Sequence, residues 1–176
     1  MLFTILAIVV VASCVVASTR RLAFAAEATA LDAGVLLTAV SAAPEAWPAI
    51  RAEIESEPTA GWERELILAL DSKQAALVNE QLGDLDYNAQ RWARVPRVCA
   101  SIASSTGFLL AALVMRNALA ADEVDVDSAI ANAINAVVVG LCGTAFCVAV
   151  HLKARSLVKE RLALTDKLVD RLESLP

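Results

Sequence analysis

The chain has 176 residues, of which 58% are hydrophobic, and its mean hydropathy is +0.60. Soluble proteins contain roughly 45 to 50% apolar residues, so this composition favours a membrane protein. The formal net charge of −5, with basic residues spread along the chain, argues against nucleic acid as a partner. The four cysteines stand in apolar runs without C-x-x-C spacing, and we expect them to be packing residues rather than a disulfide framework or a metal site.

The first apolar run covers residues 2–17 and is followed by Arg20 and Arg21. It has no basic segment before it, which argues against a secretory signal peptide, although the Val-Val-Ala-Ser stretch resembles a cleavage site. We interpret residues 1–19 as a retained signal anchor and first transmembrane helix, whose flanking arginines reach the membrane surface.

Residues 20–97 are predicted to form a helical segment outside the membrane. Apolar residues have helical spacing over 22–40, Pro44 and Pro48 then break the pattern, and a short helix starts at Pro48 and stops before Pro58. From residue 62 to 95 the apolar stripe predicts one long amphipathic helix leading into the second span. Pro96 predicts a kink at that junction.

Two further runs are long enough to cross a bilayer. Residues 98–116 carry no charge over their first 18 positions, and residues 128–152 carry no arginine, lysine or acidic residue. Three such runs in a short chain favour a membrane protein over a soluble bundle. The loop 117–127 between them contains Asp122, Glu123, Asp125 and Asp127. It lacks the glycine and terminal glutamate of an EF-hand loop, so we expect a solvated loop rather than a calcium site.

Residues 153–176 repeat leucine and valine at helical spacing, which predicts that the third span continues as a C-terminal helix. Basic residues follow the first and third spans and precede the second, so the positive-inside rule places these ends in the cytoplasm. The expected fold is an all-α membrane protein with three transmembrane helices and long cytoplasmic helical extensions. Its N-terminus is periplasmic and its C-terminus is cytoplasmic.

Polar residues within the spans are the candidate functional residues. Asn132, Asn135 and Ser128 lie on one face of the third span, and Ser105 belongs to a polar band in the second with Ser101, Ser104 and Thr106. Such groups face a pore or partner, or else bridge packed helices, and both interpretations stay open. Gly140, Gly143 and Thr144 are expected to be packing residues. His151 is interpreted as an interfacial residue, with a proton relay as the alternative.

The order of these features resembles the MotA/TolQ/ExbB family, and within it the three-span TolQ/ExbB branch. The local match covers residues 76–161, including GFLLAALV in the second span and AINAVVVGLCGTAF in the third. The resemblance implies a pentameric ring around single-span ExbD/TolR-like partners, whose membrane aspartate carries the proton. Aligned on Gly140, Asn132 takes the place of the family's glutamate and Val137 that of its threonine. Aligned on Gly107, the second span's Gly-Thr pair falls at Leu110 and Ala111.

The resemblance therefore implies an inner-membrane motor or stator subunit of bacteria that helps to couple the proton gradient to mechanical work or transport. Asn132, Asn135, Ser128, Val137, Ser105 and Ala111 are its expected pore-facing or partner-facing residues, and Gly107 joins the packing set. The alternative is a non-conducting membrane scaffold derived from the same family. An intramembrane enzyme using Ser105 and His151 is not expected, nor is a metal or cofactor.

Overall fold

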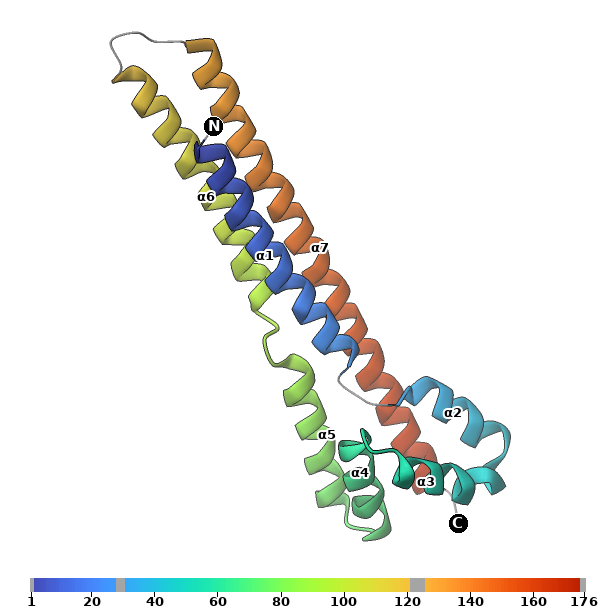
Figure 1. Cartoon of the computed structure of the whole chain (residues 1–176). Coiled ribbons are helices and arrows are strands. Elements are labelled where there is room, and N and C mark those ends of the chain that lie inside the picture. The colour runs from blue at the N-terminus through green and yellow to red at the C-terminus, as the bar shows by residue number, and fades with distance from the viewer. Residues whose placement is uncertain (1, 28–30, 121–125, 175–176) are drawn as a thin grey trace. The chain divides into compact units, whose positions relative to one another are not determined.

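The computed structural model describes residues 2–27, 31–120 and 126–174, and all regular structure within these ranges is helical. The chain forms two compact units, shown in Figure 1. The spanning unit comprises Met1–Ala23 and Trp92–Ala154, and the polar unit comprises Phe24–Arg91 and Arg155–Pro176. The prediction of an all-helical chain is confirmed.

Three helices are long and apolar enough to cross a membrane: α1 (Leu2–Ala26), α6 (Val95–Leu119) and α7 (Val126–Glu173). They include the three predicted spans and indicate a multi-pass membrane protein. Helix α7 runs unbroken for 48 residues, so the third span does continue as one helix. It contributes residues to both units.

Two buried clusters fix the directions of the three helices within the spanning unit. One cluster joins Ala7, Leu110 and Ala136, and the other includes Cys14, Cys99 and Cys147. Between the clusters the residue numbers rise along α1 and α7 but fall along α6. Helices α1 and α7 therefore run in the same direction and α6 runs against them, which is the relation that three successive spans require.

The buried face of α7 in the spanning unit consists mainly of small residues, at spacings that alternate between four and three. They are Ala129, Ala133, Ala136, Gly140, Gly143, Cys147, Val150 and Ala154. Small residues let membrane helices approach closely, because lipid provides no hydrophobic force that would drive large side chains inward. The larger residues Ile130, Ile134, Val138 and Leu141 are exposed, as a lipid-facing surface requires.

The polar unit contains α2 (Ala33–Ala42), the 3-10 turn η1 (Pro44–Ala46), α3 (Trp47–Ser56), α4 (Gly61–Asp71), α5 (Ala75–Gln90) and the last part of α7. Asp32 caps α2 by accepting a hydrogen bond from the Gly34 amide at 2.8 Å. The break at Pro44 and the short helix that follows it agree with the sequence prediction. The residues with helical spacing over 22–40 belong to two helices: the first of them form the end of α1 and the last of them lie in α2.

The prediction of one long helix over residues 62–95 is wrong, because the chain turns twice in this region. The first turn separates α4 from α5 at Lys73, whose φ is 53°. Ser72 stabilises it, since its hydroxyl donates to the Ala69 carbonyl at 2.6 Å and accepts from the Gln74 amide at 3.3 Å. Leu66, Ala69 and Val78 then pack together across the hairpin.

The second turn replaces the predicted kink at Pro96. Trp92 has a φ of 65°, and α6 begins at Val95. Pro96 lies in the first turn of α6, where its missing amide hydrogen leaves no helical bond unmade. The proline therefore starts a new helix and does not bend a continuous one.

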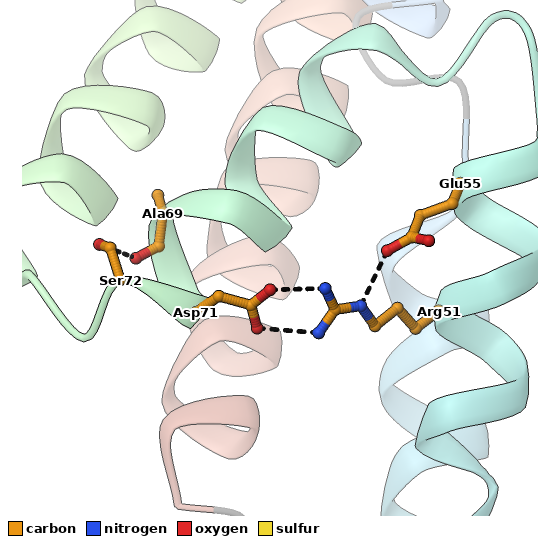
Figure 2. A network of polar contacts seen from close by, with 5 residues as sticks. All are labelled: Arg51, Glu55, Ala69, Asp71 and Ser72. Carbon is orange, nitrogen blue, oxygen red and sulfur yellow. Dashed lines mark hydrogen bonds and ion pairs between the residues drawn. The ribbon is translucent and has the colours of Figure 1, made fainter.

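A polar network ties α3 to the end of α4 in the polar unit (Figure 2). The Arg51 guanidinium donates to Glu55 at 2.8 Å and to both carboxylate oxygens of Asp71, at 2.9 and 2.5 Å. Hydrogen bonds, first to Glu55 and then to Asp71, raise the pKa of Arg51 above its ordinary value. The bidentate geometry fixes the angle between the two helices more than a single contact does.

Candidate functional site

The polar residues predicted on the third span lie along one flank of the buried stripe of α7. Ser128, Asn132 and Asn135 each directly precede one of its buried alanines, so they share one edge of the helix. Asn132 is half-buried, whereas Asn135 and Ser128 are exposed. The two amides therefore have different surroundings, although only three residues separate them.

Two serines of the polar band of α6, Ser101 and Ser105, face away from the other two helices. Ser105 is exposed and lies two residues from both Ala103 and Gly107, which are buried, so it projects from the opposite side of the helix. Ser101 is also exposed, and Ser104 and Thr106 are half-buried. Like Asn135, Ser105 occupies a surface that this chain alone leaves uncovered.

The remaining predicted pore residues are closer to the interior of the bundle. Ala111 packs against the cluster of Ala7, Leu110 and Ala136, and Val137 is half-buried. Leu110 itself is buried within this cluster. The positions matched to the family's hydroxyl residues are thus not on the outward faces that carry Ser105 and Asn135.

The two outward polar positions lie at different depths. Asn135 precedes Gly140 by five residues and Ser105 precedes Gly107 by two, and the two glycines are at the same level. Since α6 and α7 are antiparallel, these offsets point in opposite directions and separate the positions by about 10 Å along the bundle. The structure does not bring them together.

The closest contact in the spanning unit is between the backbones of α6 and α7 at Gly107 and Gly140. A Cβ atom on Gly140 would lie 2.8 Å from both the Ala103 oxygen and the Gly107 Cα. The Thr144 hydroxyl stands beside this contact, within 2.8 Å of the Gly140 carbonyl and 3.1 Å of the Ala100 carbonyl on α6. Its bond to Ala100 therefore links the two helices directly.

Helix α1 packs against the same region of α7. A Cβ on Gly143 would overlap the Val11 side chain. Farther along, the Ser18 hydroxyl donates to the Cys147 sulfur at 3.3 Å. Ser18 is a buried contact that the sequence analysis did not single out, because a serine next to a span boundary carries no signal that distinguishes it from a surface residue.

The geometry argues against a Ser105–His151 pair. His151 follows Gly140 by eleven residues and Ser105 precedes Gly107 by two, which places them about 13 Å apart along the axis of the spanning unit. A nucleophile and its base need hydrogen-bond contact, at about 3 Å. This arrangement cannot support the nucleophilic chemistry considered for the two residues.

No three His, Cys, Asp or Glu side chains in the part of the chain that the structure describes are arranged to hold a metal ion. Three residues of the acidic loop, Asp122, Glu123 and Asp125, lie outside the described residues, whereas Asp127 belongs to the first turn of α7. All four cysteines are free thiols, and three of them are buried in the spanning unit.

No protein-family model, no curated protein and no solved structure matches this chain. The resemblance to the MotA/TolQ/ExbB family therefore depends on the order of the spans and on the residues quoted above.

Proposed function

We propose that this chain is a TolQ/ExbB-like subunit of the bacterial inner membrane, which assembles into a ring around a single-span ExbD/TolR-like partner. The ring helps to couple the proton gradient to mechanical work or transport. In this assembly the polar unit lies in the cytoplasm, and spans α6 and α7 face the partner or a neighbouring subunit.

The observation that carries the proposal is the exposure of Asn135 in the apolar part of α7. Its side chain makes no hydrogen bond with the described residues of its own chain. An amide in hydrocarbon is costly unless protein or water satisfies it, so such residues face a bundle interior or a water-filled path. Ser105 and Ser101 add exposed hydroxyls on α6. A subunit that works alone leaves the requirement of Asn135 unmet.

The partner would supply the titrating group. The uncharged spans contain no carboxylate, and the glutamate and threonine of the family are replaced by Asn132 and Val137. In this arrangement Asn135 and the outward serines contact the partner helix or hold water beside its aspartate. Within the polar unit, the Arg51 network ties α3 to the end of α4.

One specific observation favours the scaffold as a second candidate. Asn132 is half-buried at the edge of the bundle, and Val137 is half-buried without a hydroxyl. Proton transfer needs a chain of groups that can donate and accept, and an amide followed by a valine interrupts such a chain. A scaffold would keep the ring and the partner contact but conduct no protons.

Co-purification tests the ring and its partner. The full chain is expressed with a candidate single-span protein that carries an aspartate in its span, and association is measured in mild detergent. We expect Asn135→Leu to weaken the complex and Ile134→Leu, at the neighbouring exposed position, to leave it intact. Association that is indifferent to Asn135→Leu, or that never occurs with any such partner, contradicts the proposal.

Proton flux then separates motor from scaffold. Vesicles that contain the complex are energised, and flux is compared with that of a complex whose partner carries Asn in place of its aspartate. If the chain is part of a motor, the complex with the partner's aspartate conducts protons and the complex with asparagine does not. If the chain is a scaffold, neither complex conducts protons. Replacing Asn132 with Glu and Val137 with Thr should raise the flux if the rest of the path is intact.

A further inference from the structure

One end of the spanning unit carries five of its six cations. Four of these five are exposed: Arg20 on α1, Arg94 and Arg97 at the start of α6, and Lys153 on α7. We call these four residues the basic end. Arg21 lies beside them but is 4% exposed, so it belongs to the interior of the bundle.

The four cations lie within about 6 Å of one another along the axis of the spanning unit. The buried cluster of Cys14, Cys99 and Cys147 defines a layer to which each helix contributes one cysteine. Arg20 and Lys153 each follow the cysteine of their helix by six residues, which is about 9 Å along the axis. Arg97 and Arg94 precede Cys99 by two and five residues, or about 3 and 7.5 Å. Because α6 is antiparallel, all four are on the same side of the layer.

No carboxylate in the described part of the spanning unit lies at the basic end. In its described part the one carboxylate side chain is that of Asp127, at the opposite end of α7. None of the four cations forms an ion pair with any residue that the structure describes. A cluster of uncompensated cations attracts an anion, and at this level the anion has to lie where the apolar part of the helices ends.

We propose that the basic end binds the phosphate of an anionic phospholipid of the surrounding leaflet. The positive charge of the basic end requires an anionic headgroup. The position favours a lipid over a free anion, because the exposed apolar residues Val98 and Ile102 on α6 lie directly after Arg97 and can contact the acyl chains of a lipid whose phosphate is bound there. Arginine suits this role because its guanidinium donates two parallel hydrogen bonds to phosphate oxygens. This inference does not depend on the proposed motor function.

Fluorescence quenching tests this site in the full chain. Trp92 belongs to the spanning unit, is 57% exposed and lies two residues before Arg94, so brominated acyl chains held at the basic end should quench it. Trp47 and Trp62 are replaced with Phe to leave one emitter. The protein is reconstituted in mixtures of brominated and unbrominated phosphatidylglycerol and phosphatidylcholine, which yield the relative affinity for the two lipids.

We expect phosphatidylglycerol to be preferred, and the preference to fall as salt screens the charges. Each cation near an anionic membrane surface contributes about a fivefold factor, so Arg94→Gln/Arg97→Gln should reduce the preference by up to about 25-fold. Arg116→Gln is the matched control, because it removes one exposed arginine from the opposite end of the same helix. Equal affinity for both lipids, or an equal loss per charge with Arg116→Gln, overturns the proposal.

Two further measurements separate lipid binding from the binding of free phosphate and from loss of folding. Inorganic phosphate added at constant ionic strength should leave the lipid preference unchanged, and abolition of the preference would identify a site for free phosphate instead of lipid. If the α6 variant does not fold, Arg20→Gln/Lys153→Gln removes the same charge from the other two helices. An unchanged preference in that variant also contradicts the proposal.

Discussion

Replacing Gly140 with alanine tests the closest approach between α6 and α7. The new methyl carbon would stand 2.8 Å from the Ala103 oxygen and from the Gly107 Cα. Both atoms are backbone atoms of a helix, which no side-chain rotation can move away. Nonbonded carbon atoms pack at about 3.5–4.0 Å, so the two helices have to separate by roughly 1 Å at this level.

The effect of Gly140→Ala on the free energy of unfolding is the sum of two losses and one gain. Overpacking of a tight interface costs about 1–3 kcal/mol. Separation also breaks the bond between Thr144 and the Ala100 carbonyl, now 3.1 Å long, and interhelical bonds of this kind contribute about 0.6 kcal/mol. Alanine recovers up to about 1 kcal/mol of helix propensity. The net expectation is a loss of about 1–3 kcal/mol in the free energy of unfolding.

The buried cysteines supply an assay that is local to the spanning unit. Cys14, Cys99 and Cys147 are buried, so a thiol-reactive dye labels them only when this unit opens, and Cys142→Ser removes the exposed thiol. In that background Gly140→Ala should lower the Tm in detergent by about 2–12 °C. Gly83→Ala in α5 is the control, since no atom lies within 4 Å of its added Cβ. A Tm unchanged by Gly140→Ala, or lowered equally by Gly83→Ala, refutes the reasoning.

Three further predictions concern the same two units. Gly143→Ala should lower the Tm in the thiol assay because its methyl overlaps Val11, and Val11→Ala should restore part of the loss. Thr144→Val keeps the shape but removes the interhelical bond, so it should cost about 0.6 kcal/mol and at most about 1.7 in that assay. In the polar unit, Arg51→Gln should cost less than about 1 kcal/mol, measured by circular dichroism, because the side chain is 34% exposed. Its raised pKa keeps the guanidinium charged, so this cost should be equal at pH 7 and pH 10 and decline only as the pH rises through that raised value.

The sequence predicts the spans well because their signal is simple. Uncharged runs of 18 residues or more have few alternatives to a spanning helix, and the leucine spacing after residue 153 carries α7 to Glu173 without a break. The flanking prolines likewise locate α3. These features depend on composition and local spacing, which are read directly from the chain.

The turn between α4 and α5 could not be predicted in this way. Neither glycine nor proline marks residues 72–74, and a lysine adopts the left-handed conformation there. The turn exists because the hairpin buries Leu66 and Val78 against Ala69, a gain that a single continuous helix lacks. Helical periodicity persists on both sides of the turn, so pattern analysis alone reads through it.

The same limit applies to the glycines. The sequence shows Gly83, Gly107 and Gly140 as equivalent interruptions of helical segments, but only the last two meet across a helix pair, and Gly83 faces open space. Which glycines pair depends on the directions and depths of the helices. Those follow from the buried clusters and not from any local pattern.

The different surroundings of Asn132 and Asn135 allow the two proposed functions to be separated. Asn135 is exposed, so it requires cover by a partner in both a motor and a scaffold. Asn132 is half-buried, and under the proposed resemblance it stands at the position of a glutamate, so we expect it to matter only where protons move. Loss of association with Asn135→Leu, combined with no flux in the unsubstituted complex, therefore identifies a scaffold, and a gain of flux from zero after Asn132→Glu/Val137→Thr identifies these two side chains as the block in its path. Loss of association together with flux that depends on the partner's aspartate identifies a motor.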